Sequence, residues 1–590
     1  MELLEKLREQ MRIYDIDAYI IPTSDFHGTE YVSDYFKSRE LLSGFTGSAG
    51  TLVVTMDNAY LWTDGRYFIQ AEKQIQGHGV ELMKMGQPGY PTINEFLHEH
   101  LSERDSLVFD GRLLSTEFVQ SLKKDLPSSI QIKCSVDLMD LIWENRPALP
   151  YSLIYKLDEY YTGMSYKEKL AMVCDKMNEY KCDLHIISSL EDQAWLYNLR
   201  ANDILHTPVF LAFTIIEDGK ATLYVDEAKI NLSIRRYLDD NEIETKPYNQ
   251  IYDDIKDIKN KNILMSLAKV NYLIYNSLKD NNFITNKEDP TLILKAIKNE
   301  VEIKNDKLVH VRDGACVAKF MKYVKENHNE LTEISASDYL ANLRHETKGY
   351  VDLSFDTIAA FKEHGAMMHY SATPETDAKL NDNGLLLVDS GGHYLGGTTD
   401  ITRTFALGEV SDEMKLHFTT VLKSVIRLAR ATFLRGCNGQ NLDILARGPI
   451  WDLLIDYKCG TGHGVGHLLS VHESPNGFRW QKVPERNDSA KFQEGMKTTD
   501  EPGIYLEGKY GIRIENEMIC VNKGKTEFGE FLGFETITCC PIDLDAINPD
   551  LLTFEEKDWL NSYHQMVYEK LSEYFQGEDN NWLRHYTRAI

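Results

Sequence analysis

Hydrophobic and polar residues follow two similar patterns in the first half of the chain. Residues 51–64, TLVVTMDNAYLWTD, are typical of a strand, a turn at Asp57-Asn58 and a second strand, because β-rich runs lie on both sides of the turn. Residues 208–230, PVFLAFTIIEDGKATLYVDEAKI, repeat this order around an Asp-Gly turn. The repetition predicts a duplicated α/β fold, although two unrelated hairpins would give the same local pattern.

The pattern breaks near Trp143, where two prolines in WENRPALP prevent a continuous helix or strand. We therefore expect an α/β multi-domain protein with a first domain over residues 1–150 and a second over 151–295. Residues 255–282 are rich in Lys, Asp and Asn and predict exposed helices and loops. Residues 292–324 have apolar positions at helical spacing and predict one long helix. This helix would open a third domain over residues 296–541, followed by a helical extension over 542–590.

Composition narrows the function classes. The 590 residues include 64 basic and 91 acidic side chains, a net charge of 64 − 91 = −27. This balance argues against nucleic-acid or anionic-membrane partners, which require basic surfaces. No run of eighteen apolar residues occurs, and the first residues lack the basic head and cleavage site of a signal peptide. Nine cysteines without metal-binding spacing then predict reduced thiols in a cytoplasmic protein.

The segment LLLVDSGGHYLGGTTDITRT, residues 385–404, carries the first candidate chemistry. Four apolar residues lead into Asp389, and Asp400 follows eleven positions later. Taken alone, Asp389 could be an ordinary turn residue. Two unpaired carboxylates in a dry interior repel each other, however, and cost several kcal/mol. The pair therefore predicts a positive group between them.

Three later stretches supply partners for the two aspartates. They are YKCGTGHGVGHLLSVHES with His463, His467 and His472, TTDEPGIYLEG with Asp500 and Glu501, and GIRIENEMICV with Arg513, Glu515 and Glu517. Apolar and polar residues alternate in the last stretch, so its charged residues share one strand face, which could also face solvent. Two Asp, one His and two Glu are enough to hold two divalent cations roughly 3.5–4 Å apart. Mostly oxygen ligands with one imidazole favour Mn²⁺, with Co²⁺ or Zn²⁺ as alternatives.

Five motifs in this order, DSG, TTDITRT, GTGHGVG, DEPGIY and GIRIEN, resemble those of the pita-bread metallopeptidases. More narrowly, the chain resembles the three-domain Xaa-Pro aminopeptidases over nearly its whole length. SGFTGSAGTLVV and LWTDGRYF are similar to the first domain of that family, and AWLYNLRANDILHTPVF is similar to its second. The resemblance implies two related creatinase-type N-terminal α/β domains followed by a pita-bread catalytic domain.

The resemblance also implies a role for each ligand. Asp389 would bind one metal, Asp400 and Glu515 would bridge both metals, and His463 and Glu501 would complete the second site. Glu501 is also a candidate proton shuttle. A metal-bridging hydroxide would be the nucleophile.

Two further histidines are implied to lie near the substrate without binding metal. They are His369, in AMMHYSATPETD, and His472, nine residues after the ligand histidine. Either would stabilise the oxyanion. The implied reaction removes one N-terminal residue from peptides with proline second, since the tertiary amide and fixed φ of proline call for a dedicated pocket. The resemblance further implies a homodimer.

One position departs from the family pattern. Some members have a histidine four residues before the ligand histidine, where this chain has Cys459. A thiol is a weaker donor than imidazole, so we assign Cys459 no catalytic role and expect a more apolar pocket. His467 is expected to pack or to support a ligand, and Arg513 to pair with the acids and orient one of them.

Three other functions are compatible with this fold. A prolidase would cut only dipeptides at the same metal site, a creatinase would use no metal, and a third type of relative is a non-catalytic peptide-binding module. Two α/β domains before the catalytic one favour the aminopeptidase over the prolidase. The complete set of five ligands argues against the other two.

Overall fold

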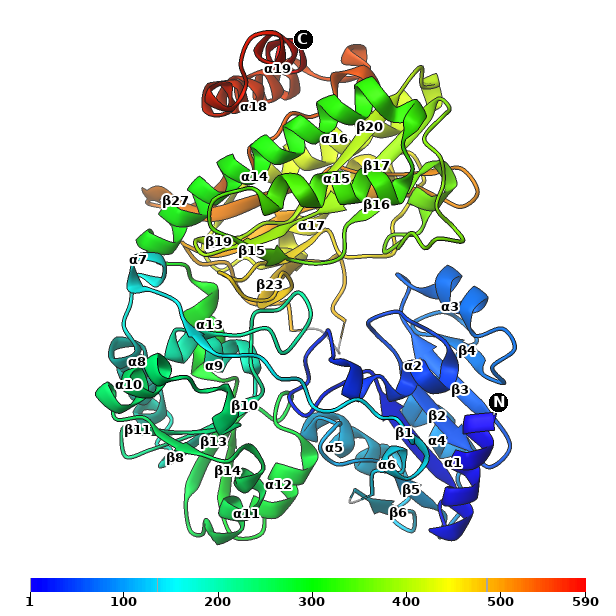
Figure 1. Cartoon of the computed structure of the whole chain (residues 1–590), viewed down its shortest axis with the longest axis vertical. Helices are drawn as coiled ribbons and strands as arrows, with labels where there is room; N and C mark the ends of the chain where they lie inside the picture. Colours follow the sequence, from blue (N-terminus) through cyan, green and yellow to red (C-terminus); the bar gives the residue numbers. More distant parts are fainter. Residues whose placement is uncertain (1, 135, 484–486) are drawn as a thin grey trace. The chain divides into compact units, whose positions relative to one another are not determined.

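The structure is a computed structural model that describes residues 2–134, 136–483 and 487–590. The chain forms two compact units, Met1–Leu157 with Met164–Leu292, and Asp158–Gly163 with Ile293–Ile590. The first unit contains two six-stranded sheets, and the second contains antiparallel sheets crossed by long helices (Figure 1). None of the described helices combines the length and apolarity that a bilayer crossing needs.

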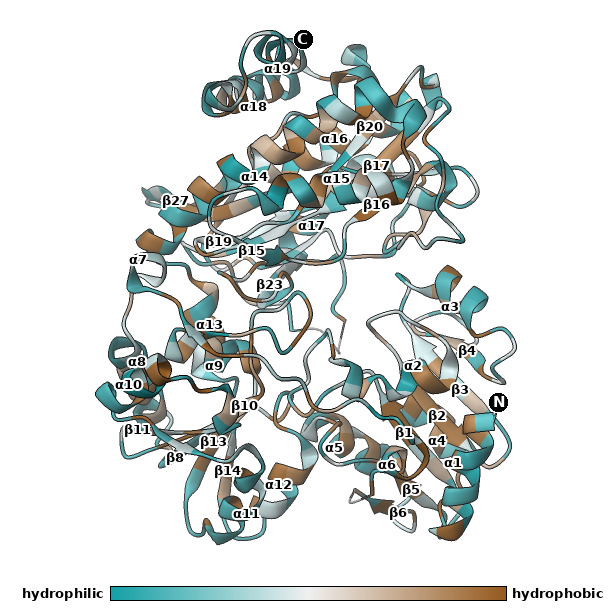
Figure 2. Ribbon diagram, viewed as in Figure 1, coloured by the Kyte–Doolittle hydropathy of each residue, from teal (hydrophilic) through white to brown (hydrophobic). Residues whose placement is uncertain are grey.

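The first six-stranded sheet has the order β4-β3-β2-β1-β5-β6. Its strands are β1 (Ala18–Pro22), β2 (Thr51–Thr55), β3 (Ala59–Thr63), β4 (Glu81–Lys84), β5 (Ser106–Val108) and β6 (Gln131–Lys133). β2 and β3 form the predicted antiparallel hairpin. Helix α1 (Glu2–Ile13) buries Leu4, Leu7 and Met11, which recur at helical spacing. Figure 2 shows the apolar character of these central strands in brown.

The second sheet repeats the first in order and direction. Its order is β12-β11-β10-β8-β13-β14. Its strands are β8 (Leu184–Ile187), β10 (Ala212–Glu217), β11 (Lys220–Val225), β12 (Glu244–Lys246), β13 (Asn262–Met265) and β14 (Phe283–Asn286). In both sheets the three central strands pair antiparallel and the outer strands pair parallel. The β10–β11 hairpin turns through Asp218 and Gly219, which both have positive φ. The predicted duplication is confirmed.

Residues 255–282 differ from the prediction of exposed helices and loops. They contain β13, which lies between β8 and β14 and buries Ile263, Leu264 and Met265. The apolar run is only three residues long, and Lys and Asn on both sides mask it in the sequence. Its buried strand character depends on two neighbouring strands that are distant in the sequence.

The long helix expected over residues 292–324 is two helices, α13 (Pro290–Ala296) and α14 (Glu300–Asn327). Asn299 separates them. Its side chain accepts hydrogen bonds from the backbone N–H groups of Val301 and Glu302 and caps α14. An asparagine that caps a new helix competes with continuation of the old one.

The strands of the second unit hold the predicted site. β16 (Ile358–Phe361), β17 (Gly384–Ser390) and β20 (Ile401–Leu407) form one antiparallel sheet. A larger sheet has the order β21-β28-β27-β24-β22-β23. Its strands are β21 (Thr432–Leu434), β22 (Gly462–Gly464), β23 (Glu473–Phe478), β24 (Lys497–Asp500), β27 (Asn516–Thr526) and β28 (Gly529–Thr536). β25 (Gly503–Leu506) and β26 (Tyr510–Arg513) form a hairpin beside them.

Long helices cover these strands. α14, α15 (Glu333–His345) and α16 (Asp412–Ala429) cross the sheets in Figure 1, and α17 (Gly439–Trp451) contacts α16 and β23. Phe418, Val421 and Val425 of α16 pack in one core with Ile512 and Ile514 of the ligand-bearing segment. This core fixes the apolar side of the segment and leaves its acidic side for the site.

The C-terminal segment is mainly helical. It forms two helices, α18 (Phe554–Leu571) and α19 (Glu578–Tyr586). Leu560 and Val567 of α18 and Leu583 of α19 are buried in the core of the second unit.

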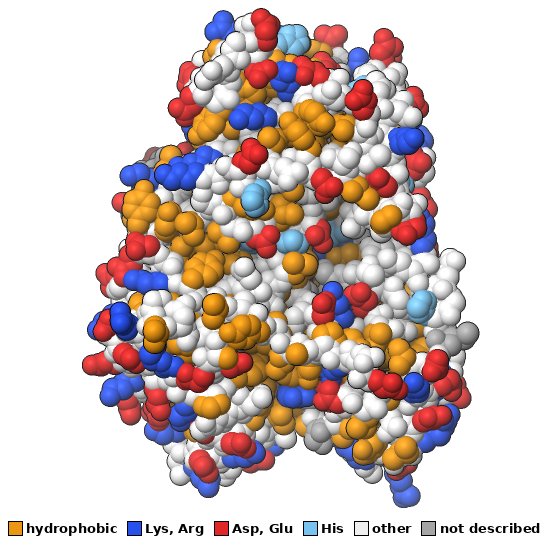
Figure 3. Space-filling model, in the orientation of Figure 1, with side chains coloured by type: hydrophobic (Ala, Val, Ile, Leu, Met, Phe, Trp, Pro, Cys, Tyr) orange, Lys and Arg blue, Asp and Glu red, His pale blue; other side chains and the backbone are white. Residues whose placement is uncertain are grey.

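The surface of the protein carries both charges, and acidic and basic side chains are interspersed on the face in Figure 3.

Candidate functional site

The predicted ligands lie at strand ends that pairing brings together. β17 pairs with β20, so Asp389 lies opposite Thr402, two residues after Asp400. His463 lies in β22, which pairs with β24, and β24 ends one residue before Glu501. Hydrogen-bond pairing of strands therefore places residues that are far apart in the sequence around one point.

Glu515 joins this group from the gap between β26 and β27. Its backbone N–H donates to the carbonyl oxygen of Thr402 at 3.1 Å. The alternation seen in the sequence is therefore divided between β26 and β27, with a break between them. Arg513 ends the first strand, and Glu517 lies in the second.

Asp400, His463 and Glu515 form the tightest cluster. One potential ligand atom from each lies within 4.8 Å of those from the other two. His463 Nε2 is 3.4 Å from Asp400 Oδ2 and 3.3 Å from Glu501 Oε1. His463 Nδ1 is 2.9 Å from the carbonyl oxygen of Gly464, to which it can only donate. Nε2 therefore faces the acids, which is the orientation that a metal ligand needs.

Burial and mutual repulsion dominate the electrostatics of the acids. Burial, followed by the charges of Asp389 and Glu501, holds the pKa of Asp400 well above its ordinary value. Burial, followed by the charges of Asp400 and Glu501, raises the pKa of Glu515 in the same way. The charge of Asp389 raises the pKa of Glu515 as well as that of Asp400, so the Asp389 carboxylate lies near both acids. The protein alone therefore concentrates more negative charge than it neutralises here.

Two carboxylate oxygens of the cluster are buried without a hydrogen-bond partner among the described residues. They are Asp389 Oδ1 and Glu515 Oε1. Buried polar atoms are normally satisfied, and an exception in a native protein calls for an ion or a water molecule. The donor set, the inward-pointing lone pairs and the excess of negative charge fit divalent cations.

Arg513 orders the acids as the sequence led us to expect. Its Nη2 pairs with Asp389 Oδ2, its Nε donates to Thr402 Oγ1 at 3.0 Å and its Nη1 donates to the hydroxyl of Tyr505 at 2.7 Å. Thr402 Oγ1 in turn donates to Glu515 Oε2 at 2.7 Å. One guanidinium thus fixes two acids, one directly and one through a hydroxyl.

The two predicted substrate histidines are both half-buried. The His472 ring packs edge-on against His463, with 4.5 Å between ring centroids and an interplanar angle of 84°. His369 follows Met368, whose carbonyl oxygen lies 3.5 Å from Arg513 Nη2. Both segments therefore reach the acidic cluster.

Sequence reasoning placed Glu517 among the candidate partners of the two aspartates but gave it no specific role, and it contacts one of the predicted ligands. Its Oε1 accepts the backbone N–H of Asp400 at 2.6 Å. Thr402 and Tyr505 were also missed. The only sequence signal for Glu517 was its place in the alternating segment. Its partner is a backbone amide, which nearly every residue type has, so side-chain identity does not reveal the contact.

Cys459 and His467 lie as expected outside the ligand cluster. Cys459 packs against the apolar core, and burial raises the pKa of its thiol to about 11. A neutral thiol suits the expected apolar pocket. His467 Nδ1 lies 3.4 Å from Asp306 Oδ2, so it contacts a different carboxylate.

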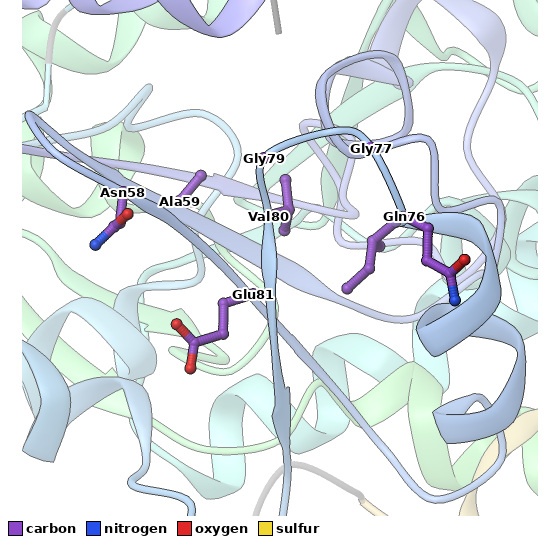
Figure 4. Close-up of a pocket in the computed structure, with 8 residues that line it drawn as sticks. Asn58, Ala59, Gln76, Gly77, Gly79, Val80 and Glu81 are labelled. Carbon is purple, nitrogen blue, oxygen red and sulfur yellow. The ribbon is translucent and has the colours of Figure 1, made fainter.

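Two surface cavities contain none of the predicted site residues. One, of about 450 Å³, lies in the first unit beside β3 and β4 and is lined by Asn58, Ala59, Ile75, Gln76, Gly77, Gly79, Val80 and Glu81 (Figure 4). The other, of about 540 Å³, lies between α14 and α19. The second cavity is lined by Glu326, Glu578 and His585, but all three are exposed. The strand-end cluster buries its acids and is therefore the better candidate for chemistry.

Comparison with known sequences divides the chain in the expected order. Profiles of the creatinase/prolidase N-terminal domain match residues 4–146 and 145–302. The profile of metallopeptidase family M24 matches residues 307–522, and that of the C-terminal region of this family matches residues 530–590. The expectation of two creatinase-type domains followed by a pita-bread domain is confirmed.

Full-length relatives narrow the family. The chain is 36% identical to a probable Xaa-Pro aminopeptidase P of Laccaria bicolor, covering 99% of this chain and 92% of the relative. It is also 36% identical to Xaa-Pro aminopeptidase 1 of Dictyostelium discoideum, covering 100% and 96%. A crystal structure of X-prolyl aminopeptidase from Caenorhabditis elegans, described as a cytosolic enzyme with a di-nuclear active site, superimposes with a TM-score of 0.94 at 32% identity over 100% of this chain and 99% of that one. The chain therefore belongs to the Xaa-Pro aminopeptidase family of the M24 metallopeptidases.

Proposed function

We propose that this protein is a dinuclear-metal aminopeptidase that hydrolyses the bond between an N-terminal residue and a proline in second position. The observation that carries this proposal is the cluster of Asp400, His463 and Glu515, whose two acids are buried, with Asp389 and Glu501 beside it. Relatives that match the whole chain and bear the name Xaa-Pro aminopeptidase support the choice of substrate.

The five clustered residues would hold two divalent cations, as the di-nuclear site of the Caenorhabditis elegans enzyme suggests. We infer Mn²⁺ as the resident ion, with Co²⁺ or Zn²⁺ as alternatives, since four carboxylates and one imidazole favour hard or borderline cations. When bound, the cations would supply Lewis-acid activation of water and of the scissile carbonyl, and would offset the repulsion between the acids.

The side chains around the cluster would perform the remaining steps. His472, packed against His463, and His369, next to Met368, would donate hydrogen bonds to the oxygen that gains charge at the scissile carbonyl. Glu501 Oε1, which faces His463 Nε2 at 3.3 Å, would carry a proton toward the proline nitrogen as it leaves. The surrounding acids would also hold the free α-amino group of the substrate.

We further propose a homodimer in the cytoplasm. The family resemblance supports the dimer, and the description of the Caenorhabditis elegans enzyme as cytosolic supports the compartment. Nine cysteines that are all free as thiols agree with a reducing environment. The acidic net charge of −27 would keep such dimers soluble.

A cleavage assay with matched peptides tests the activity. The Mn²⁺-loaded protein should release alanine from Ala-Pro-Ala, and should leave both Ala-Ala-Ala and N-acetylated Ala-Pro-Ala intact. Cleavage of the dipeptide Ala-Pro alone would instead identify a prolidase. Metal analysis of the same sample should give two ions per chain, and a protein without metal or cleavage would refute the proposal.

A further inference from the structure

A group of charged side chains is buried next to the predicted ligands but is not among them. It consists of Asp306 and His310 on α14, Lys497 at the start of β24, Glu517 on β27, and His467. Each of the five is at most 3% exposed. Asp306 and His310 are four residues apart and so lie on one face of α14. A helix face that meets a sheet is normally apolar, so this polar group calls for an explanation.

Lys497 is the centre of the group. Its Nζ lies 2.9 Å from Asp306 Oδ1 and 3.2 Å from Glu517 Oε2, and it donates to the carbonyl oxygen of Thr398 at 3.0 Å. His310 Nε2 lies 3.2 Å from the other Glu517 oxygen. Burial lowers the pKa of the Lys497 ammonium, but Asp306 and Glu517 outweigh this effect and raise it overall. Lys497 is therefore a permanent buried cation that holds two carboxylates.

Two of these contacts end on the backbone around Asp400. Glu517 Oε1 accepts the N–H of Asp400 at 2.6 Å, and Thr398 lies two residues before Asp400. The packing is also tight, because a Cβ atom added at Gly397 would lie 2.0 Å from Asp306 Oδ1. Lys497 thus holds the segment that leads into Asp400 at two points. It binds the carbonyl oxygen of Thr398 directly, and it binds Glu517, which accepts the Asp400 N–H.

Stability alone gives little reason for such a group. Replacing a buried ion pair with apolar residues of similar volume is often neutral or stabilising. Residues that orient metal ligands from outside, however, typically change metal affinity or activity ~10–100-fold when mutated. Lys497 reaches the backbone of Thr398 and, through Glu517, that of Asp400, so its loss should change metal affinity or activity in this way.

We propose that Lys497 is a positioning residue that acts through Glu517 and Thr398 to hold Asp400 in the geometry for metal binding. The inference rests on the proposed metal site. Lys497 would contact neither substrate nor metal, so its loss should lower metal affinity and leave the chemical step unchanged.

Mn²⁺ titration of the metal-free protein tests this role. Lys497→Met keeps the length of the side chain and removes its charge, so we expect Mn²⁺ to bind ~10–100-fold more weakly. At saturating Mn²⁺ the kcat should return to near the wild-type value. The matched control is Lys229→Met, which breaks an equally buried pair with Asp203 in the first unit. This control should lose stability while keeping the wild-type affinity for Mn²⁺.

Two further variants complete the test. In Glu517→Gln the side-chain amide nitrogen would face the Lys497 ammonium, so the Mn²⁺ affinity of this variant should also fall. Glu517→Gln alone tests the proposal if Lys497→Met does not fold. The double variant should bind Mn²⁺ more tightly than Lys497→Met, because the amide oxygen that Glu517→Gln introduces can still accept the Asp400 N–H without an uncompensated charge. Affinities within about twofold of wild type in a folded single variant would overturn the proposal. If the wild type itself bound no Mn²⁺, the proposed function would fail instead.

Discussion

At the scale of single residues, Asp400 is a predicted ligand whose backbone is also held from outside the cluster. It shares the cluster with His463 and Glu515, and its backbone is held by Glu517. Asp400→Ala should abolish turnover and lower metal content, with a loss greater than the ~10–100-fold typical of residues outside the ligand set. The fold should persist, because the change also relieves repulsion between buried acids. Near-normal turnover with two bound ions would show that Asp400 is not a ligand.

His472 should behave differently from a ligand. His472→Ala removes a donor to the developing oxyanion, so kcat should fall by about 10²–10³ while metal content stays at the wild-type level. Steady-state kinetics on Ala-Pro-Ala and metal analysis of the same preparation check both parts. Loss of metal in this variant would mean that His472 binds metal and that the histidine roles are exchanged.

Asp289 predicts a pH dependence that is independent of the site. Burial, and after it the charge of Asp192, holds the pKa of Asp289 well above its ordinary value, and His185 Nε2 lies 3.8 Å away with a pKa lowered to about 4 by burial. The folded state therefore keeps a proton that the unfolded chain releases above about pH 4. This contribution to stability is present at low pH and is lost as the pH rises toward the folded pKa.

Relative to the wild type, Asp289→Asn should therefore gain stability progressively as the pH rises above 4 and be more stable at pH 7, since the amide needs no proton. Urea unfolding of the first unit from pH 4 to pH 8 measures this. The exposed Asp280 provides the control, and Asp280→Asn should leave the curve unchanged. A parallel shift of the Asp289→Asn curve at every pH would contradict a buried neutral carboxyl group.

At the scale of elements, α14 packs so closely on the backbone near Cys539 that a substitution favouring the helix would disrupt the packing. Gly314 lies in α14, and a Cβ atom there would lie 1.7 Å from the carbonyl oxygen of Cys539. Alanine favours a helix over glycine by about 1 kcal/mol, but the backbone oxygen cannot move as a side chain can. Gly314→Ala should therefore lower the free energy of unfolding by about 1–3 kcal/mol, measured by chemical denaturation. An increase would show that α14 shifts freely.

At the scale of the whole molecule, local pattern predicted the repeated hairpins and the motifs of the site, because both depend on neighbours in the sequence. The hairpin turn at Asp218-Gly219 and the ligand motifs are of this kind. Strand β13 could not be predicted, because its three buried residues become core only between β8 and β14. The break at Asn299 was missed because a capping side chain outweighed a continuous apolar pattern. The role of Glu517 depends on a backbone amide 117 residues away.

The spread of the predicted ligands along the chain, from Asp389 to Glu515, has a kinetic consequence. β17, β24 and β27 must all be paired before the donor atoms meet, and contacts between such distant residues form late in folding. Bound Mn²⁺ should therefore stabilise the native state but not the transition state. At 100 times its Kd, each bound Mn²⁺ ion adds about 2.7 kcal/mol, which corresponds to roughly 100-fold slower unfolding of the second unit per ion, with little change in refolding rate. Stopped-flow measurements of unfolding and refolding with and without Mn²⁺ check this. Faster refolding at an unchanged unfolding rate would show that the ligands already lie together in the folding transition state.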